Sequence, residues 1–165
     1  MYEGRFRAVR DTVEYPNGKV IAHETITHPG AVVILPVSND GGLLLVEQYR
    51  HSIASMLLEF PAGTLEAGEE PRLCAERELA EEAGFAANEW ISLGVLYPAP
   101  GFCDELQHLF LARGLSTSYA KPDDDEIITL HPMSIKDFEK AIASGLVNDA
   151  KSISIFFKAR LLGLL

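Results

Sequence analysis

The sequence predicts a single domain of mixed α/β class, with helices packed over a β-sheet. Its 165 residues suffice for one hydrophobic core and are too few for two full domains. Residues 31–37 form an unbroken apolar run between turn signals, which suits a strand buried on both faces. Strand-like segments precede one helical segment, and three further strands and two helices follow. This order is typical of helices that cover a mixed sheet.

The N-terminal region is predicted to form a β-hairpin over residues 5–28. Phe6–Val9 and Val20–His23 have strand-like composition, and Pro16-Asn17-Gly18 lies between them. Asn and Gly tolerate positive φ, so this tripeptide favours a reversal of the chain between two strands.

The remaining elements are predicted from periodicity and from end signals. The first helix begins with Pro71 near its N-terminus and stops at Gly84. Ser134, with Asp137 three residues later, resembles a capping arrangement for the second helix. The expected strands are Ala31–Val37, Leu43–Tyr49 as its partner, Trp90–Tyr97, Gln107–Ala112 and Ile127–His131, and the expected helices are Pro71–Ala83, Ile135–Ala143 and Ala150–Leu162.

Composition excludes several classes of protein. The formal net charge is −10 and the chain has no Lys/Arg cluster, so a nucleic-acid groove is not expected. The most apolar stretches fall short of the ~20 residues that a membrane helix needs. Cys74 and Cys103 are too few for a disulfide framework, and the first eleven residues carry charges instead of a signal segment. We therefore expect a cytoplasmic protein without nucleic-acid or membrane partners.

The first predicted helix carries an acidic stripe. On a helical wheel Glu78, Glu81 and Glu82 fall within an arc of about 100°, opposite much of the apolar face. Like charges at this spacing repel, whereas a hard divalent cation such as Mg²⁺ prefers carboxylate oxygens together with substrate phosphates. The helix alone leaves a solvated acidic face as the alternative. Glu76 falls inside the apolar arc, and the sequence offers no reason for it.

The spacing of these residues favours the metal site over the solvated face. The segment matches the pattern Gly-x5-Glu-x7-Arg-Glu-U-x-Glu-Glu-x-Gly-U, in which U is apolar. The chain therefore resembles the Nudix hydrolases, enzymes that cleave a nucleoside diphosphate linked to another group. The matching residues are Gly63, Glu69, Arg77, Glu78, Leu79, Glu81, Glu82, Gly84 and Phe85.

The resemblance implies a Nudix fold, in which a mixed β-sheet is sandwiched between helices, and a site for Mg²⁺ or Mn²⁺. Glu78 and Glu82 are the expected metal ligands. Glu81 is either a further ligand or the group that handles the attacking water. The roles left for the other matching residues are structural. Glu69 and Arg77 hold the loop and the carboxylates in place, and Gly63 and Gly84 allow backbone turns at the two ends.

Segments outside this motif resemble the ADP-ribose pyrophosphatase branch of the family. In that branch the arginine at the position of Arg50 contacts the diphosphate, and the backbone carbonyl at Ala62 binds metal. Glu59 belongs to the expected substrate-binding set. A plain ion pair of Arg50 with Glu47 or Glu59 is the alternative, because surface ion pairs are common.

Residues 98–105 look like the substrate loop of the same branch. Pro100, Gly101, Asp104 and Glu105 are the expected substrate contacts, with the two acids suited to the hydroxyls of the terminal ribose. By itself Pro-x-Pro-Gly is only a turn signal. Residues 145–152 resemble the final helix–loop–helix of the branch, so the resemblance covers nearly the whole chain.

An acidic loop at residues 123–126 completes the expected site. The resemblance makes Glu126 a metal ligand, and it places Asp124 where some relatives carry a glutamate proposed as the catalytic base. The side chain of Asp124 is one methylene shorter than that glutamate. By composition alone the loop is a solvated turn.

The expected function is Mg²⁺-dependent hydrolysis of ADP-ribose to AMP and ribose 5-phosphate. One alternative is a pyrophosphatase for another nucleoside diphosphate sugar such as GDP-mannose. The other is a regulator that binds a nucleotide without cleaving it. Residues 1–30 are expected to form a dimerisation segment and residues 31–165 the hydrolase domain, so the expected assembly is a homodimer.

Overall fold

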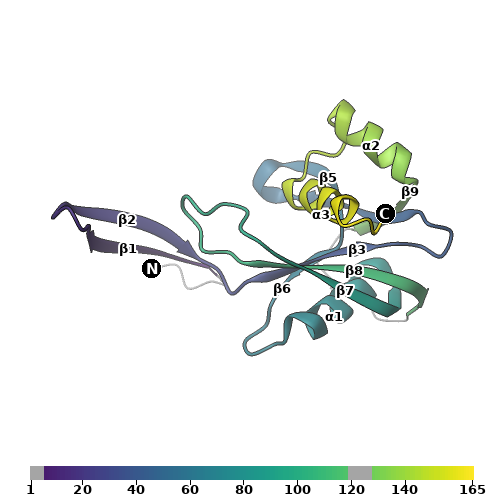
Figure 1. Cartoon of the computed structure of the whole chain (residues 1–165), viewed down its shortest axis with the longest axis horizontal. Coiled ribbons are helices and arrows are strands. Elements are labelled where there is room, and N and C mark those ends of the chain that lie inside the picture. Colours follow the sequence, from purple (N-terminus) through teal and green to yellow (C-terminus); the bar gives the residue numbers. More distant parts are fainter. Residues whose placement is uncertain (1–5, 119–127) are drawn as a thin grey trace.

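The computed structural model describes residues 6–118 and 128–165. Within these ranges the chain forms a two-stranded hairpin, a four-stranded sheet, a three-stranded sheet and three α-helices (Figure 1). The strands are β1 (Arg7–Glu14), β2 (Val20–Thr27), β3 (Ala31–Pro36), β4 (Leu43–Arg50), β5 (Ser55–Glu59), β6 (Ala62–Thr64), β7 (Phe85–Leu96), β8 (Gln107–Thr117) and β9 (Ile128–Met133), and the helices are α1 (Pro71–Ala83), α2 (Ile135–Ser144) and α3 (Ala150–Leu161), with a short 3-10 turn, η1 (His51–Ile53).

The four-stranded sheet has the order β6-β3-β8-β7 and lies at the centre of the molecule. The pair β3–β8 is parallel, whereas β3–β6 and β7–β8 are antiparallel, so the sheet is mixed as predicted. Successive side chains of β3 point to opposite faces. Val33 and Leu35 pack toward α3, and Val32 and Ile34 pack toward α1, so helices cover both faces of the sheet (Figure 1).

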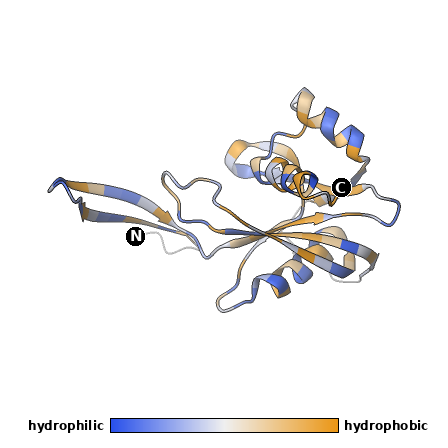
Figure 2. Ribbon diagram, in the orientation of Figure 1, coloured by the Kyte–Doolittle hydropathy of each residue, from blue (hydrophilic) through white to orange (hydrophobic). Residues whose placement is uncertain are grey.

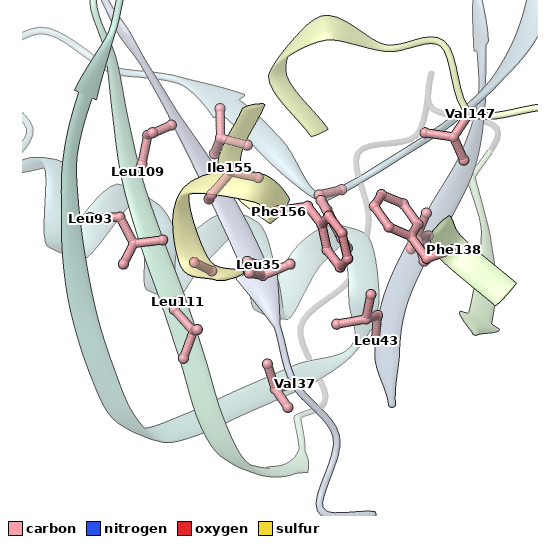
Figure 3. Close-up of a cluster of buried hydrophobic side chains, with 14 of the residues drawn as sticks. Leu35, Val37, Leu43, Leu93, Leu109, Leu111, Phe138, Val147, Ile155 and Phe156 are labelled. Atoms are coloured by element: carbon pink, nitrogen blue, oxygen red, sulfur yellow. The ribbon is translucent and has the colours of Figure 1, made fainter. Parts of the chain in front are cut away.

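The larger core lies between this sheet and the two C-terminal helices (Figure 3). Leu35 of β3, Leu111 of β8 and Phe156 of α3 all belong to this buried cluster (Figure 3). The ring of Phe138 in α2 lies 4.7 Å from that of Phe156 and 5.0 Å from that of Phe60, measured between centroids. These aromatic contacts fix α2 and α3 over the chain segment that joins β5 to β6. Truncating such a buried Phe to Ala typically costs about 3–5 kcal/mol.

The prediction that Leu43–Tyr49 pairs with the buried strand is wrong. β4 lies in the three-stranded antiparallel sheet, ordered β5-β4-β9, and meets the end of β3 only through a bridge between Val37 and Leu43. Both edges of β3 are already occupied, one by β6 and the other by β8. The sequence did not reveal the competing strands, because β6 has three residues and no alternating pattern.

Among the other predicted strands, the two hairpin strands, β7 and β8 are all longer than predicted, by about four or five residues each. β7 begins at Phe85, directly after the glycine that ends α1, and not at Trp90. Its first residues pair with the far end of β8, which extends to Thr117. The predicted helices α1, α2 and α3 are all confirmed to within one residue at each end. None of these described helices combines the length and the apolarity needed to cross a bilayer.

The N-terminal hairpin projects from the body of the molecule (Figure 1). Its two strands pair in register from Arg7–Thr27 to Glu14–Val20, and Gly18 takes a φ of 77° in the turn, as the sequence predicted. Most of its side chains are exposed, and short hydrophobic and hydrophilic stretches follow one another along it (Figure 2). A hydrogen bond from the Ile26 N–H to the Phe102 carbonyl, 2.8 Å long, joins the base of the hairpin to the loop between β7 and β8.

Candidate metal centre

The acidic stripe predicted on α1 faces the protein and not bulk solvent. Buried Leu79 and Ala83 pack the helix against the central sheet, and Glu82 is itself only 7% exposed. The side chains of Glu78 and Glu81 are 12% and 25% exposed. Burying several carboxylates without counter-charges is unfavourable, so such an arrangement requires partners from the protein or from a ligand.

Two consecutive residues of β6 meet two glutamates that lie one helical turn apart on α1. Oε2 of Glu82 accepts a hydrogen bond from the backbone N–H of Ala62 at 2.9 Å. Glu78 packs against Gly63 so closely that a Cβ added there would lie 1.8 Å from its carboxylate carbon. Gly63 therefore has no side chain because a carboxylate occupies that space. The predicted role of Gly63 in a backbone turn is wrong, since it lies within a strand and has no positive φ.

Arg77 joins the acidic residues on the outer side of the helix. Its guanidinium binds Glu69 through two nitrogens, at 3.0 and 3.1 Å. Its Nη1 also donates to Glu78 at 2.8 Å and to Glu81 at 3.0 Å. The hydrogen bond from Arg77 lowers the pKa of Glu69 to about 2. The same contacts, that with Glu69 first, raise the pKa of Arg77, so the cation persists at every working pH. Arg77 thus orients the carboxylates that the sequence assigned to it.

We expect the Arg77→Met variant to return the pKa of Glu69 from about 2 toward its ordinary value of 4.5. A carboxylate with a depressed folded-state pKa stabilises the fold above its unfolded-state pKa, and it loses that contribution as the pH falls through the folded-state value. The wild type should therefore lose this contribution between about pH 4.5 and pH 2, whereas the variant lacks it at any pH. Carboxyl NMR titration of the metal-free protein measures the shift.

Arg72→Met is the matched control for this titration. Arg72 lies on the same helix, but it pairs with Glu76 at 2.7 Å and stacks over Trp90 at 4.4 Å. That variant should leave the pKa of Glu69 unchanged, and an unchanged value in Arg77→Met as well would contradict the assignment. The ion pair between Arg72 and Glu76 also explains why an acidic residue occurs in the apolar arc of the helix, for which the sequence offered no reason. Glu76 binds the cation that covers the Trp90 ring.

The donor atoms gathered here fit a hard divalent cation. The carboxylate of Glu82 lies beside the backbone of Ala62, and that of Glu78 lies beside Gly63. Carboxylate and backbone carbonyl oxygens are the ligands that Mg²⁺ and Ca²⁺ prefer. Within residues 6–118 and 128–165, no three acidic, histidine or cysteine side chains converge as a complete metal cage. Asp124 and Glu126, which the sequence added to the site, lie outside the described residues.

Arg50 stands near the acidic residues and is held by a carboxylate from β5. Its Nε donates to Oε1 of Glu59 at 2.7 Å, which is one of the two ion pairs that the sequence left open. Burial alone would lower the pKa of Arg50, but the surrounding carboxylates raise it. These carboxylates belong to Glu59, Glu82 and Asp149. Glu59 is 1% exposed, so its predicted part in substrate binding would act through Arg50.

The sequence did not single out Lys151, the second cation at Glu59. Its Nζ contacts Oε2 of Glu59, and it also lies 3.1 Å from Oδ2 of Asp149. The available signal was the spacing of Asp149 and Ser152, which is that of a helix cap and predicts that α3 starts beside them. No periodicity indicates that this start faces Glu59, 92 residues away in the chain.

The predicted substrate loop lies between β7 and β8, next to the base of the hairpin. Pro100, Gly101 and Asp104 line an open pocket there, together with His23, Glu24, Thr25, Tyr97, Phe102 and Cys103. Oδ1 of Asp104 accepts a hydrogen bond from the His28 N–H at 2.7 Å, and Glu105 accepts one from the Gln107 side chain at 2.8 Å. Both acids are therefore oriented by neighbouring residues, and their contact with substrate stays a prediction.

The chain is similar to proteins of one known family in both sequence and structure. The model of the NUDIX domain matches residues 27–153 of the chain. An ADP-ribose pyrophosphatase of Bacillus subtilis (strain 168) is 41% identical over 144 residues, which cover 86% of this chain and 78% of that protein. A methanol dehydrogenase activator of Bacillus methanolicus is 38% identical over 145 residues, with coverage of 87% and 78%. A crystal structure of an ADP compounds hydrolase matches with a TM-score of 0.86 at 26% identity, covering 98% of this chain and 89% of that one.

Proposed function

The chain belongs to the Nudix family, and from that premise we propose that it hydrolyses the diphosphate bond of ADP-ribose to AMP and ribose 5-phosphate with the help of Mg²⁺. The observation that carries the proposal is the contact of Glu82 with Ala62 and of Glu78 with Gly63. This contact gathers oxygen donors of the kind that hold a divalent cation. The name of the Bacillus subtilis relative supports ADP-ribose as the substrate.

Each residue of the site has a defined task in this proposal. Glu78, Glu82 and the backbone carbonyl of Ala62 hold the divalent cation, for which Mg²⁺ is the first choice and Mn²⁺ a substitute. When bound, the cation neutralises negative charge on the diphosphate and favours attack by water. Glu81 either adds a further oxygen ligand or orients the attacking water. Arg50 places a permanent positive charge against the diphosphate.

The assignments outside the described residues, and those in the substrate loop, remain part of the proposal. Glu126 supplies a further metal ligand, and Asp124 occupies the position of a candidate base. Asp104 and Glu105 face the hydroxyls of the terminal ribose. The pocket beside the hairpin supports this placement, because Asp104 and Gly101 line it together with exposed aromatic side chains suited to a nucleotide.

Incubation with a substrate panel tests the proposed function. The panel contains ADP-ribose, GDP-mannose, UDP-glucose, NADH and dinucleoside polyphosphates, each with and without Mg²⁺, and the products are separated by chromatography. We expect AMP and ribose 5-phosphate from ADP-ribose, and no product after chelation of the metal. Faster cleavage of GDP-mannose would favour the alternative pyrophosphatase, since small changes in a pocket redirect specificity.

A regulator that binds nucleotide without cleaving it is the other alternative. The name of the Bacillus methanolicus relative, methanol dehydrogenase activator, describes a protein that acts on another enzyme. Binding of one panel compound without cleavage of any would favour it. The presence of Glu78, Glu81 and Glu82 together favours the enzyme, because a regulator has no need to gather repelling carboxylates.

We also infer a reducing, cytoplasmic setting. Cys74 and Cys103 are both free thiols. Burial raises the pKa of Cys74 to about 12, so this thiol stays protonated and unreactive. A free buried thiol is ordinary in a reducing compartment, where disulfides are rare.

The hairpin supports the proposal of a homodimer. An isolated two-stranded hairpin is only marginally stable in water, so it needs an apolar surface to pack against. Val13 and Ile21 are paired across the two strands on one face, and both are more than 40% exposed. Tyr15 lies on the same face and is also exposed. A second copy of the chain would cover this surface.

We expect light scattering to give the mass of two chains at working concentrations. Changing Val13 and Ile21 together to Glu should yield a monomer, because the charges would have to be buried in the interface. The matched control changes Thr12 and Ala22, the neighbouring cross-strand pair on the opposite face, to Glu and should leave the dimer intact. A wild-type protein that is monomeric would contradict the proposal.

A further inference from the structure

The buried carboxylate of Glu59 is shared by two cations that arrive from different parts of the fold. Glu59 ends β5, and its side chain is 1% exposed. Oε1 binds Nε of Arg50 at 2.7 Å, and Oε2 binds Nζ of Lys151 in the first turn of α3. Each oxygen of the Glu59 carboxylate thus contacts a different cation, and neither cation contacts both oxygens.

This division constrains Arg50. A guanidinium next to a free carboxylate prefers two parallel hydrogen bonds, one to each oxygen. Because Lys151 occupies Oε2, Arg50 engages Glu59 through Nε alone. Among the described residues the two terminal nitrogens of Arg50 have no hydrogen-bond partner, and its side chain is 36% exposed. These nitrogens therefore remain available to bind an anion.

Lys151 is itself fixed by the start of α3. Asp149 caps this helix by accepting from the Ser152 N–H at 2.9 Å, and it lies 3.1 Å from the Lys151 ammonium. Ser152 accepts a hydrogen bond at 2.7 Å from the backbone N–H of Phe60, the residue after Glu59. The first turn of α3 therefore holds both the side chain of Glu59 and the backbone that leads to Ala62.

We propose that Lys151 is a positioning residue for substrate binding: by occupying Oε2 of Glu59, it prevents Arg50 from closing onto that carboxylate and keeps its terminal nitrogens directed at the diphosphate. The inference rests on the proposed function, from which the role of Arg50 comes. Lys151 acts through Arg50 and not on the substrate, since its side chain is 13% exposed and already lies between two carboxylates.

Steady-state kinetics with ADP-ribose test the inference. Lys151→Met frees Oε2, so Arg50 should turn to it and the KM should rise about tenfold to a hundredfold, the loss expected for one charged hydrogen bond. Adding Lys151→Met to the Arg50→Met variant should leave its KM unaltered, because Lys151 acts on the substrate only through Arg50. A merely structural role would lower the thermal midpoint and leave KM alone. Independent, additive effects on KM would overturn the inference.

Two further variants distinguish the proposed effect on KM from a loss of folding in Lys151→Met. Lys151→Arg keeps a cation at Oε2 and should retain a KM near that of the wild type. Glu59→Gln with Lys151→Met removes one buried charge of each sign, and its KM should agree with that of Glu59→Gln alone within about twofold. Lys158→Met, two turns further along α3, is the matched control and should leave KM unchanged.

A ligand-free measurement separates this inference from the proposed function. In Lys151→Met the two-point grip of Glu59 should slow rotation of the Arg50 guanidinium, so that its terminal nitrogens give separate NMR signals. In the wild type and in Lys151→Arg they should average. Identical Arg50 signals in all three proteins would overturn the inference whatever the enzyme cleaves. Failure of the wild type to cleave any panel compound would instead contradict the proposed function, and the NMR result still decides the part played by Lys151.

Discussion

Glu82→Gln should cut turnover of ADP-ribose by about two to three orders of magnitude, because a metal contact contributes several kcal/mol to the transition state. The substitution keeps the shape of the side chain and an oxygen that accepts from the Ala62 N–H. It removes the negative charge that is proposed to hold the cation and replaces the second oxygen with an NH2 group, which cannot bind a cation. The fold and the thermal midpoint of the metal-free protein should therefore change little, while the affinity for Mg²⁺ falls.

Glu76→Gln is the control for this experiment. Glu76 lies on the same helix, but its side chain is 48% exposed and pairs with Arg72. It should leave turnover unchanged, since it neither faces β6 nor contacts Arg77. Comparable turnover in Glu82→Gln and the wild type, measured at saturating Mg²⁺ and again at low Mg²⁺, would remove Glu82 from the metal site.

The second large effect is expected from Gly63→Ala, a change that adds one methyl group. The new Cβ would lie 1.8 Å from both the carboxylate carbon and Oε1 of Glu78, a distance that no relaxed structure tolerates. Glu78 is flexible at that end, so its carboxylate should move away at small cost to stability. The displaced carboxylate would no longer lie at Gly63, next to the residue whose N–H binds Glu82. We expect metal affinity to fall about tenfold to a hundredfold and turnover to fall with it.

Calorimetric titration with Mn²⁺ and thermal unfolding of the metal-free protein check the two halves of this prediction. Thr64→Ala, the next position on the same strand, is the control and should leave both measurements near their wild-type values. A Gly63→Ala protein that unfolds much earlier would mean that the clash is relieved by the backbone and not by Glu78. Unchanged metal affinity would mean that Glu78 is not a ligand.

Parts of the fold followed from local sequence because their signals are local. The helix from Pro71 to Ala83 begins with a proline and ends at Gly84 in a left-handed conformation, and both signals are read from neighbouring residues. The hairpin turn at Gly18 is likewise local. Strand partners could not be predicted from local sequence. The sequence pairs Leu43–Tyr49 with the nearest strand in the chain, whereas the structure pairs it with β5 and β9. Pairing depends on which edges are free, and this is a property of the whole sheet.

In the candidate site, too, the sequence indicated some features and only the tertiary structure revealed others. The spacing of Glu78, Glu81 and Glu82 indicated a cation site on one helix face, and the family resemblance named the neighbouring Ala62. The function of Gly63 was misjudged, because its lack of a side chain serves a contact with α1 and not a turn. Lys151 was not assigned a role at all. Its partner Glu59 is 92 residues away, and no pattern within either segment links the two.

The sequence by itself determined the chemistry of this protein: helix periodicity and residue spacing place carboxylates on one face of α1, and these are short-range properties of the chain. Which residues those carboxylates contact was decided by the tertiary structure alone. Glu82 reaches Ala62, Glu78 fills the space at Gly63, and the first turn of α3 grips Glu59. Such contacts depend on how the sheet and helices pack, because burial in a shared core brings together residues that sequence order keeps apart.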